Sequence, residues 1–205
     1  MVSVSKNSQR IKPQFNYIDT VYNGIKIEEY DFNDTPDSYL LWMGRMVPEK
    51  GALEAILVAK QAGQKLILAT LSNDMEPTYW KKVKSKLSKN ITILVDRTGK
   101  SKIKLLKNAK ALLNPISWEE PFGLIPIEAQ ACGTPVISFN RGALSETVLN
   151  TQTGFLVSNT EQMMKALDKI KTISRKACRS WVEKNFTVQI MTDNYERVYK
   201  QLTTK

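Results

Sequence analysis

Short apolar runs alternate with amphipathic segments along the chain from about residue 39 onward. Several of these runs are apolar at successive positions, which indicates strands that are buried on both faces, as in a parallel sheet. The expected strands are residues 39–43, 65–70, 91–95, 111–116, 135–139 and 154–157. Apolar residues recur with helical spacing between them, which predicts helices at about residues 50–62, 77–89, 101–108, 123–132 and 143–149.

This alternation predicts an α/β fold, in which a Rossmann-like, doubly wound parallel sheet of about six strands carries helices on both faces. After residue 158 the pattern is helical only, which adds C-terminal helices. The last of these helices carries an apolar stripe that should pack against another part of the structure. Its members are Ile190, Met191, Tyr195, Val198 and Leu202. In such a sheet, ligands bind at the carboxyl ends of the strands, in the loops that lead into helices.

The length of 205 residues favours one globular domain with a well-buried core. No run of 18 apolar residues occurs, and residues 1–10 lack the apolar centre of a signal peptide, so we expect a soluble cytoplasmic protein. Cys132 and Cys178 are too few and too far apart for a disulfide framework. We interpret both as reduced thiols in or near the core.

The net charge of +10 is concentrated between residues 81 and 110, which hold eleven Lys or Arg against Asp96 alone. Trp80, Val83 and Leu87 recur with helical spacing, so the lysines should lie on the outer face of a helix. A solvated helix face is one interpretation, and a surface that attracts anionic lipid is another, at about 1 kcal/mol per basic residue. Aromatic residues do not interleave with these lysines, so we expect no nucleic-acid partner.

The loop after the first strand, "LLWMGRMVPEKGALEA", is the first that carries candidate chemistry. Gly44 allows the backbone to turn sharply, and Arg45 and Lys50 follow at the N-terminus of the next helix. Two cations beside free helix N–H groups suit a diphosphate, although the same residues also occur in ordinary strand-to-helix turns. The loop is not a Walker loop, and the chain contains no Gly-x-Gly-x-x-Gly.

The second candidate is "WEEPFGLIPIEAQACGTPVI". Glu120 should lie in the loop before a helix that starts near Leu124, and Glu128 should lie about one turn into that helix. Both carboxylates can then face one ligand, with the N–H groups of Phe122, Gly123 and Leu124 between them. Carboxylates accept hydrogen bonds from sugar hydroxyls and helix N-termini bind phosphate, so this layout fits a nucleotide sugar. The alternative is a surface turn with solvated glutamates.

With "RGALSETV" and "TGFLV", these motifs resemble the carboxyl-terminal, donor-binding domain of the family-four retaining glycosyltransferases of GT-B fold, over about residues 39–157. The resemblance implies that Arg45 and Lys50 bind the donor diphosphate, that Glu120 contacts the transferred sugar and that Glu128 holds the ribose hydroxyls. The implied catalytic residues are Arg45, Lys50 and Glu120, and the implied donor-binding residues are Gly44, Phe122, Gly123, Leu124 and Glu128.

The resemblance also implies the reaction, the transfer of a hexose from a nucleoside-diphosphate sugar, with UDP or GDP, to a glycan, a lipid-linked sugar or a polysaccharide. No cofactor or metal is expected, in keeping with a chain that has no histidine and no Asp-x-Asp. The loop "LATLSNDMEPTYW" departs from the family because it lacks the glycine that usually turns near the nucleotide base.

The same resemblance predicts the domain organisation. Residues 1–38 would be the end of a missing N-terminal domain with its linker, residues 39–185 the nucleotide-sugar-binding domain, and residues 186–205 a closing helix. We therefore expect the isolated chain to be inactive without an N-terminal acceptor domain as its partner.

Two other classes of function compete with this interpretation. One is a non-catalytic module that binds a nucleotide or sugar, or a subunit of a split glycosyltransferase. The other is an adaptor at the inner membrane surface that uses the basic residues between 81 and 110. The second is compatible with transferase activity.

Overall fold

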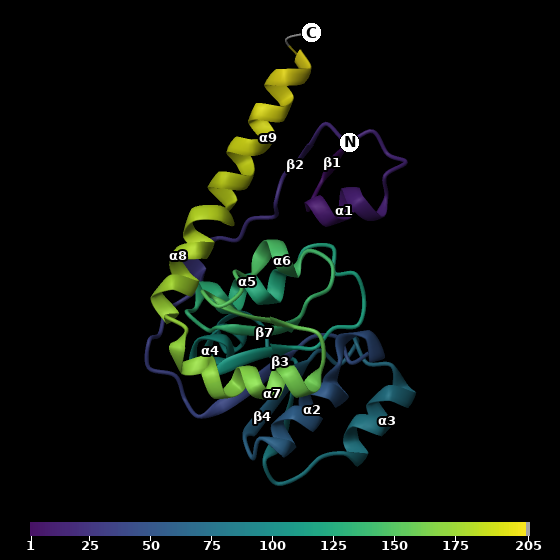
Figure 1. The fold of residues 1–205 in the computed structure, drawn as a ribbon, viewed down its shortest axis with the longest axis vertical. Coiled ribbons are helices and arrows are strands. Elements are labelled where there is room, and N and C mark those ends of the chain that lie inside the picture. Colours follow the sequence, from purple (N-terminus) through teal and green to yellow (C-terminus); the bar gives the residue numbers. More distant parts are fainter. Residues whose placement is uncertain (204–205) are drawn as a thin grey trace.

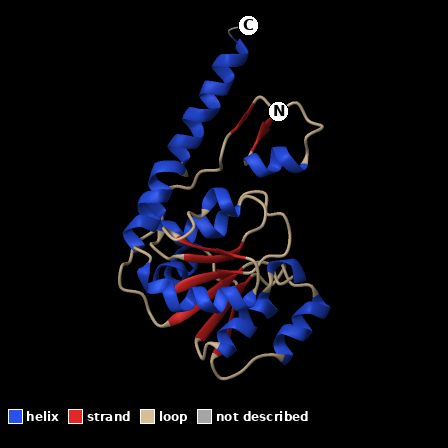
Figure 2. Cartoon of the chain, in the orientation of Figure 1, coloured by secondary structure: helices blue, strands red, loops and turns tan. Residues whose placement is uncertain are grey.

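A computed structural model describes residues 1–203, and its centre is a six-stranded, fully parallel sheet between two layers of helices (Figures 1 and 2). The strands of this sheet are β3 (Tyr39–Met43), β4 (Lys65–Thr70), β5 (Ile91–Val95), β6 (Ala111–Asn114), β7 (Val136–Phe139) and β8 (Gly154–Val157). The predicted α/β class and strand number are confirmed, and a strand occurs at each predicted place.

The strand order is β5-β4-β3-β6-β7-β8, so the chain reverses its direction of travel across the sheet between β3 and β6. These two strands are hydrogen-bonded neighbours, with Leu40 opposite Ala111. In doubly wound sheets the loops diverge at such a switch point and leave a crevice at the carboxyl ends of the strands. The topology alone therefore places a binding crevice beyond Met43 and Asn114.

Each face of the sheet has its own apolar cluster. Side chains of α2 (Ala52–Gln61), α3 (Pro77–Ser85) and α7 (Thr160–Lys169) share one cluster with inward residues such as Leu40 and Leu68. Side chains of α4 (Gly99–Asn108), α5 (Leu124–Ala131) and α6 (Leu144–Thr147) share the other with Leu41 and Leu112. Cys132 and Cys178 are buried free thiols, as expected.

The helical C-terminal part contains a 3-10 turn at Ile170–Thr172, then α8 (Arg175–Asn185) and α9 (Val188–Thr203). α8 packs against α5. Two arginines of α8 cap neighbouring carbonyl groups: Arg175 donates to Ala109 O at 2.9 Å, and Arg179 donates to Ala131 O at 2.8 Å. These bonds fix the layer that contains α5 in place, which matters because α5 carries one of the candidate carboxylates.

The N-terminal segment is more ordered than its sequence pattern indicates. β1 (Val2–Ser3) and β2 (Asp19–Thr20) pair in parallel, and α1 (Lys6–Ile11) lies between them in the chain. The segment is attached to the main body by Glu146, whose carboxylate accepts the N–H groups of Lys6 at 2.8 Å and Asn7 at 2.9 Å. A 3-10 turn at Ile27–Glu29 leads from it toward β3.

The apolar stripe of α9 packs only in part. Val198 is buried and Arg197 pairs with Asp19 at 2.8 Å, so the helix runs beside the N-terminal segment (Figure 1). Leu202 is 50% exposed, and for this residue the prediction of packing is wrong within the described chain. Residues 204–205, the end of the predicted closing helix, lie outside the described residues.

Two further element predictions need correction. The strand predicted over 111–116 ends at Asn114 because Pro115 has no N–H to donate to the sheet. The helix predicted over 77–89 ends at Ser85, so Leu87 lies beyond it and is 38% exposed. Tyr79 takes the buried position instead, and its hydroxyl accepts the N–H of Leu53 at 3.1 Å.

The basic residues between 81 and 110 do not form one continuous face. α3 packs in the same apolar cluster as α2, whereas α4 packs on the opposite side of the sheet with α5. The lysines therefore form two groups, one on each side of the sheet.

Candidate functional site

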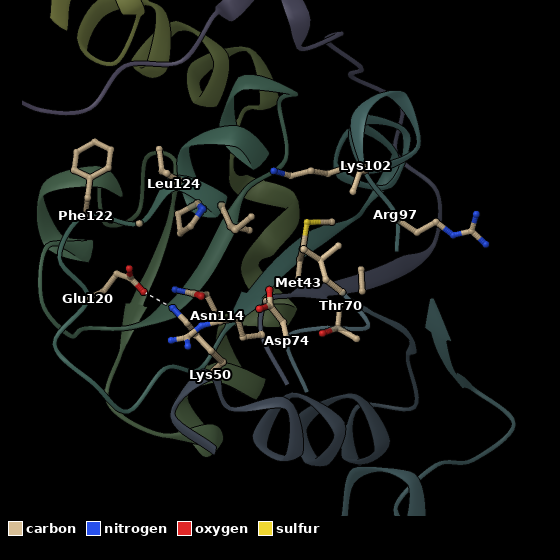
Figure 3. A pocket seen from close by; sticks show the side chains of 18 of the residues that line it. Met43, Lys50, Thr70, Asp74, Arg97, Lys102, Asn114, Glu120, Phe122 and Leu124 are labelled. Atoms are coloured by element: carbon tan, nitrogen blue, oxygen red, sulfur yellow. Dashed lines mark hydrogen bonds and ion pairs between the residues drawn. The ribbon is translucent and has the colours of Figure 1, made fainter. Parts of the chain in front are cut away.

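A cavity of about 640 Å³ opens at the switch point, where the sequence predicted a binding crevice (Figure 3). Its floor is formed by residues at the carboxyl ends of three strands, Met43, Thr70 and Asn114. The loops at 44–50 and 120–126 form one side, and residues 97–102 form the other. The volume is within the usual range of roughly 300–1,000 Å³ for small-molecule sites.

Lys50 and Glu120 meet on the wall of this cavity. Lys50 Nζ lies 2.8 Å from Glu120 Oε2, and the Trp118 indole donates to the same oxygen at 3.0 Å. The ammonium also lies 4.4 Å from the centroid of the Trp118 ring, a cation–π contact. Two loops from either side of the switch point are thus joined by charged groups that line the cavity.

Local backbone geometry explains how Lys50 reaches this position. Pro48–Lys50 form a 3-10 turn, and Gly51 ends it in the left-handed region with φ 72°. A side chain at Gly51 would place its Cβ 2.1 Å from the carbonyl oxygen of Pro115, so only glycine fits. The carbonyl of Lys50 accepts the Trp42 indole N–H at 2.8 Å, which fixes the backbone of the turn.

Arg45 and Gly44 also line the cavity, as predicted. Arg45 is exposed to solvent as well as lining the cavity. The N–H of Gly44 donates to Ala69 O at 3.1 Å, which keeps it in the sheet. A Cβ at Gly44 would make only ordinary contacts, at 3.6 Å from the Trp42 ring and 3.8 Å from the Lys50 side chain, and its backbone is not left-handed, so the expectation that this turn needs a glycine is wrong.

The start of α5 forms the adjoining wall. Gly123 precedes the helix with φ 96°, and Leu124 is its first residue, as the sequence predicted. The first N–H groups of a helix have no intrahelical acceptor and carry partial positive charge. Phe122 lines the same wall, but its ring is buried against Phe186, with the two ring centroids 5.8 Å apart. Phe122 is therefore a packing anchor that positions the backbone of this wall.

Glycine in "RGALSETV" supports the loop that carries Glu120. Gly142 has φ 59°, and a Cβ there would lie 2.2 Å from Glu120 N and 2.3 Å from Glu120 O. The carbonyl of Glu120 accepts the N–H of Ala143 at 2.8 Å, and Glu119 Oε2 accepts the N–H of Gly142 at 3.1 Å. The motif that follows β7 therefore holds the carboxylate loop by close backbone contact.

Glu128 lies on α5 about one turn from its start, as predicted, but behind the cavity wall. Its side chain is only 10% exposed, and Lys102 Nζ lies 2.7 Å from Oε1 and 2.6 Å from Oε2. The Tyr30 hydroxyl donates to Oε1 at 2.9 Å. Burial, and then the charge of Glu128, raise the pKa of Tyr30, so this hydroxyl remains a donor throughout the physiological range.

Of the two carboxylates that were predicted to face one ligand, Glu120 lines the cavity and Glu128 does not. Lys102, one of several lining residues absent from the sequence prediction, separates Glu128 from the cavity. Asp74, Thr70 and Asn114 also line the cavity, and the sequence analysis did not identify them as site residues. Thr70 and Asn114 end strands β4 and β6, and this position at the carboxyl end of a strand is the signal that could have identified them.

No group of three or more acidic, histidine or cysteine side chains that could hold a metal ion occurs among residues 1–203. In the same part of the chain, no helix is both long enough and apolar enough to cross a membrane.

The fold and the site together define a doubly wound α/β domain with a cavity at its topological switch point that carries both cationic and acidic side chains. A family model of glycosyl transferases, group 1, matches residues 26–187, and the chain belongs to this family. The resemblance to the carboxyl-terminal domain of GT-B glycosyltransferases is confirmed.

Curated relatives agree with this assignment. The chain is 31% identical over 151 residues to a glycogen synthase of Mycobacterium tuberculosis, an alignment that covers 69% of the chain and 36% of that protein. It is 52% identical over 56 residues to a D-inositol 3-phosphate glycosyltransferase of Rhodococcus jostii, over 26% of the chain and 12% of that protein. The chain spans about a third of the length of the glycogen synthase.

Solved structures share the fold at low sequence identity. AviGT4, a glycosyltransferase involved in avilamycin A biosynthesis, superposes with a TM-score of 0.86 at 22% identity, over 100% of this chain and 64% of that one. An Anabaena protein, HepE, in complex with UDP-glucose superposes with a TM-score of 0.82 at 19% identity, over 100% of this chain and 63% of that one.

Proposed function

We propose that this chain is the donor-binding half of a retaining glycosyltransferase that uses a nucleoside-diphosphate sugar. The observation that carries the proposal is that Lys50, Glu120 and the start of α5 line adjoining walls of the switch-point cavity. A cationic loop, a helix N-terminus and a carboxylate within one cavity suit a ligand that has phosphates beside hydroxyl groups.

In this proposal the cations bind the diphosphate and stabilise the charge that develops as it leaves. Arg45 and Lys50 supply fixed positive charge, and the first N–H groups of α5 supply partial positive charge from the adjoining wall. Preorganised charge of this kind is usually the largest single contribution to such catalysis. Glu120 accepts hydroxyl groups of the transferred sugar and orients it, and Glu128 belongs to the ribose end.

The base at the far end is uracil or guanine, with UDP tested first because the HepE structure holds UDP-glucose. The proposed acceptor is a glycan, a lipid-linked sugar or a growing polysaccharide. Residues of the N-terminal segment, Val4 and Asn23, border the cavity. We propose that an N-terminal GT-B domain binds the acceptor on this side, and that the chain alone binds donor without transferring the sugar.

Thermal unfolding of the purified chain in the presence of UDP, GDP, ADP and their glucose or mannose derivatives tests the donor site. A ligand at 100 times its dissociation constant stabilises the folded protein by about 2.7 kcal/mol, which raises the midpoint by several degrees. We expect one diphosphate series to stabilise the protein. Arg45→Ala should abolish the preference for the diphosphate over the matching nucleoside, whereas Lys81→Ala, which removes an exposed charge on α3, should leave that preference unchanged.

Absence of stabilisation by every nucleoside diphosphate would contradict the donor-binding proposal. Binding of a donor, combined with no transfer to any acceptor when an N-terminal domain is supplied, would instead favour a non-catalytic binding module. The anomeric configuration of the product, measured by NMR, tests whether transfer retains stereochemistry.

Peripheral attachment to the inner membrane surface, with the protein in the cytoplasm, is a separate proposal. The lysines of α3 and the turn after it lie on one side of the sheet, next to the exposed Leu87, and form the more favourable of the two basic groups. Vesicles with anionic lipid should bind the chain at low salt and release it as salt rises. Equal binding to neutral vesicles would contradict this proposal.

A further inference from the structure

A second cavity lies at the opposite end of the sheet from the switch-point cavity. Two of the residues that line it, Lys110 and Pro135, directly precede strands β6 and β7, so this cavity is at the amino ends of the strands. Its volume is about 400 Å³, within the usual range of roughly 300–1,000 Å³ for small-molecule sites. The proposed transferase function makes no use of this cavity.

The lining of the second cavity is strongly cationic. Four basic side chains and one carboxylate, that of Asp34, line it; the basic residues are Lys110, Lys171, Arg175 and Lys176. Lys171 and Lys176 are exposed, and within residues 1–203 neither forms a hydrogen bond or an ion pair. Their ammonium groups are therefore available to a ligand.

Arg175 is the buried member of this group, with 9% of its surface exposed. Four of its five N–H groups donate to neutral oxygens, which are Asn33 O at 2.6 Å, Lys107 O at 2.7 Å, Thr134 Oγ1 at 2.8 Å and Ala109 O at 2.9 Å. In the described part of the chain it forms no ion pair with a carboxylate, and burial lowers its pKa. The carbonyl groups at the end of α4 carry only about half a negative charge, so part of the guanidinium charge is uncompensated.

The start of α8 adds positive charge at the same place. Ser174 is the N-cap residue of α8, Arg175 and Lys176 are its first two residues, and all three line the cavity. The first N–H groups of a helix have no intrahelical acceptor and favour an acidic side chain nearby, yet the first turn of α8 has none. An anion in the cavity would supply the missing negative charge.

We propose that this cavity is a second binding site, one that takes the phosphate group of a phosphomonoester, either free in solution or on a lipid. Lys171 and Lys176 contact the phosphate oxygens, and Arg175 adds fixed charge while it keeps its own hydrogen bonds. A phosphomonoester carries a charge of about −1.5 to −2 at pH 7 and three acceptor oxygens, which suits several donors around one group. The organic part of the ligand lies against apolar lining residues such as Pro135 and Ile173.

Isothermal titration with glycerol 3-phosphate tests the site in solution. The affinity is measured for the wild-type chain, for Lys171→Met/Lys176→Met and for the control Lys169→Met/Lys184→Met. Lys169 and Lys184 are exposed residues of α7 and α8 that do not line the cavity, so the control loses the same charge from the same helical region. Arg175 is left unchanged because its loss would also remove four structural hydrogen bonds.

We expect the wild-type chain to bind glycerol 3-phosphate with a dissociation constant below about 1 mM. Loss of Lys171 and Lys176 should weaken binding about tenfold or more, whereas the control should change it by less than about twofold. Asp34→Asn removes the one carboxylate of the lining and should tighten binding about threefold, which keeps the test decisive if the double variant does not fold. Dimethyl phosphate, which carries a single charge, should bind at least about tenfold more weakly than the monoester.

Vesicles with phosphatidic acid test the lipid source of the same group. Weaker vesicle binding by Lys171→Met/Lys176→Met than by the control would assign the phosphate to a lipid. A difference with glycerol 3-phosphate alone would assign it to a soluble ester. Equal affinities of the double variant and its control for both probes would overturn the inference, and so would failure of the wild-type chain to bind either probe.

Discussion

Two lysine–glutamate pairs stand at opposite ends of one cavity, and their surroundings differ more than their geometry. Lys50 and Glu120 are 2.8 Å apart, and Lys102 and Glu128 are 2.6 Å apart. In the first pair the carboxylate itself lines the cavity, whereas in the second only the lysine does. Similar ion pairs therefore present different chemistry to a ligand.

The difference follows from where each carboxylate sits in the fold. Glu120 is on a loop that packs against Gly142 on one side and borders the cavity on the other. Glu128 is on α5, between the linker residue Tyr30 and the helix α4 that carries Lys102. Each carboxylate accepts two donors, so the difference between them is access: Glu120 lines the cavity, and Glu128 lies behind Lys102.

The largest expected effect concerns folding stability. Removal of one partner of a buried pair leaves the other charge without compensation, at a cost of about 3 kcal/mol or more. Glu128→Ala should therefore lower the free energy of unfolding by about 3 kcal/mol. Glu120→Ala should lower it by about 1 kcal/mol, because Glu120 lines the cavity and water can take the place of its carboxylate, whereas Glu128 lies behind the cavity wall. Urea denaturation measures both.

The double variant Lys102→Met/Glu128→Ala serves as the control for this experiment. It should be less destabilised than the sum of its single variants, because the two groups form one interaction. Equal destabilisation by Glu120→Ala and Glu128→Ala would show that the two pairs are equally buried in solution, and the comparison would fail.

The second prediction distinguishes the Glu120 end of the cavity from the Glu128 end by the ligands whose binding each one affects. If Glu120 contacts the sugar as proposed, Glu120→Ala should weaken binding of the nucleotide sugar about tenfold relative to the nucleoside diphosphate, which would retain its contact with Lys50. Glu128→Ala should weaken both ligands by about the same factor. Titration of both ligands into both variants gives the four affinities, and loss of nucleoside diphosphate binding in Glu120→Ala would contradict the assignment.

Local sequence signals placed both residues of the first pair in loops at the carboxyl ends of strands, but they did not predict the contact between them. A glycine-rich turn after a strand, a Pro-Phe-Gly sequence before a helix and the rule that strand ends form the crevice all concern neighbouring residues. These signals predicted the strand positions, the start of α5 at Leu124 and the presence of Lys50 and Glu120 on one site.

The second pair forms because α4 and α5 lie close together in the fold, and no pattern among neighbouring residues in the sequence predicts this. Lys102 is one of eleven basic residues between 81 and 110, and nothing in its neighbourhood in the sequence distinguishes it from Lys104. It becomes a site residue because α4 and α5 lie on the same face of the sheet, which follows from the reversal of strand order. The sequence did not predict the secondary structure of the N-terminal segment for a similar reason, because α1 is stabilised by Glu146, which lies far away in the sequence.

The smallest expected effect concerns the aromatic donor of the first pair, the Trp118 indole, whose counterpart in the second pair is the Tyr30 hydroxyl. Its N–H donates to Glu120 Oε2 at 3.0 Å while its ring lies against the Lys50 ammonium. Trp118→Phe keeps an aromatic face for Lys50 but removes the donor, so Glu120 loses one orienting hydrogen bond of about 1 kcal/mol. We expect the preference for nucleotide sugar over nucleoside diphosphate to fall about threefold to fivefold, with the affinity for the diphosphate unchanged. A fall in diphosphate affinity instead would show that Trp118 acts mainly through Lys50, whose ammonium lies against the indole ring.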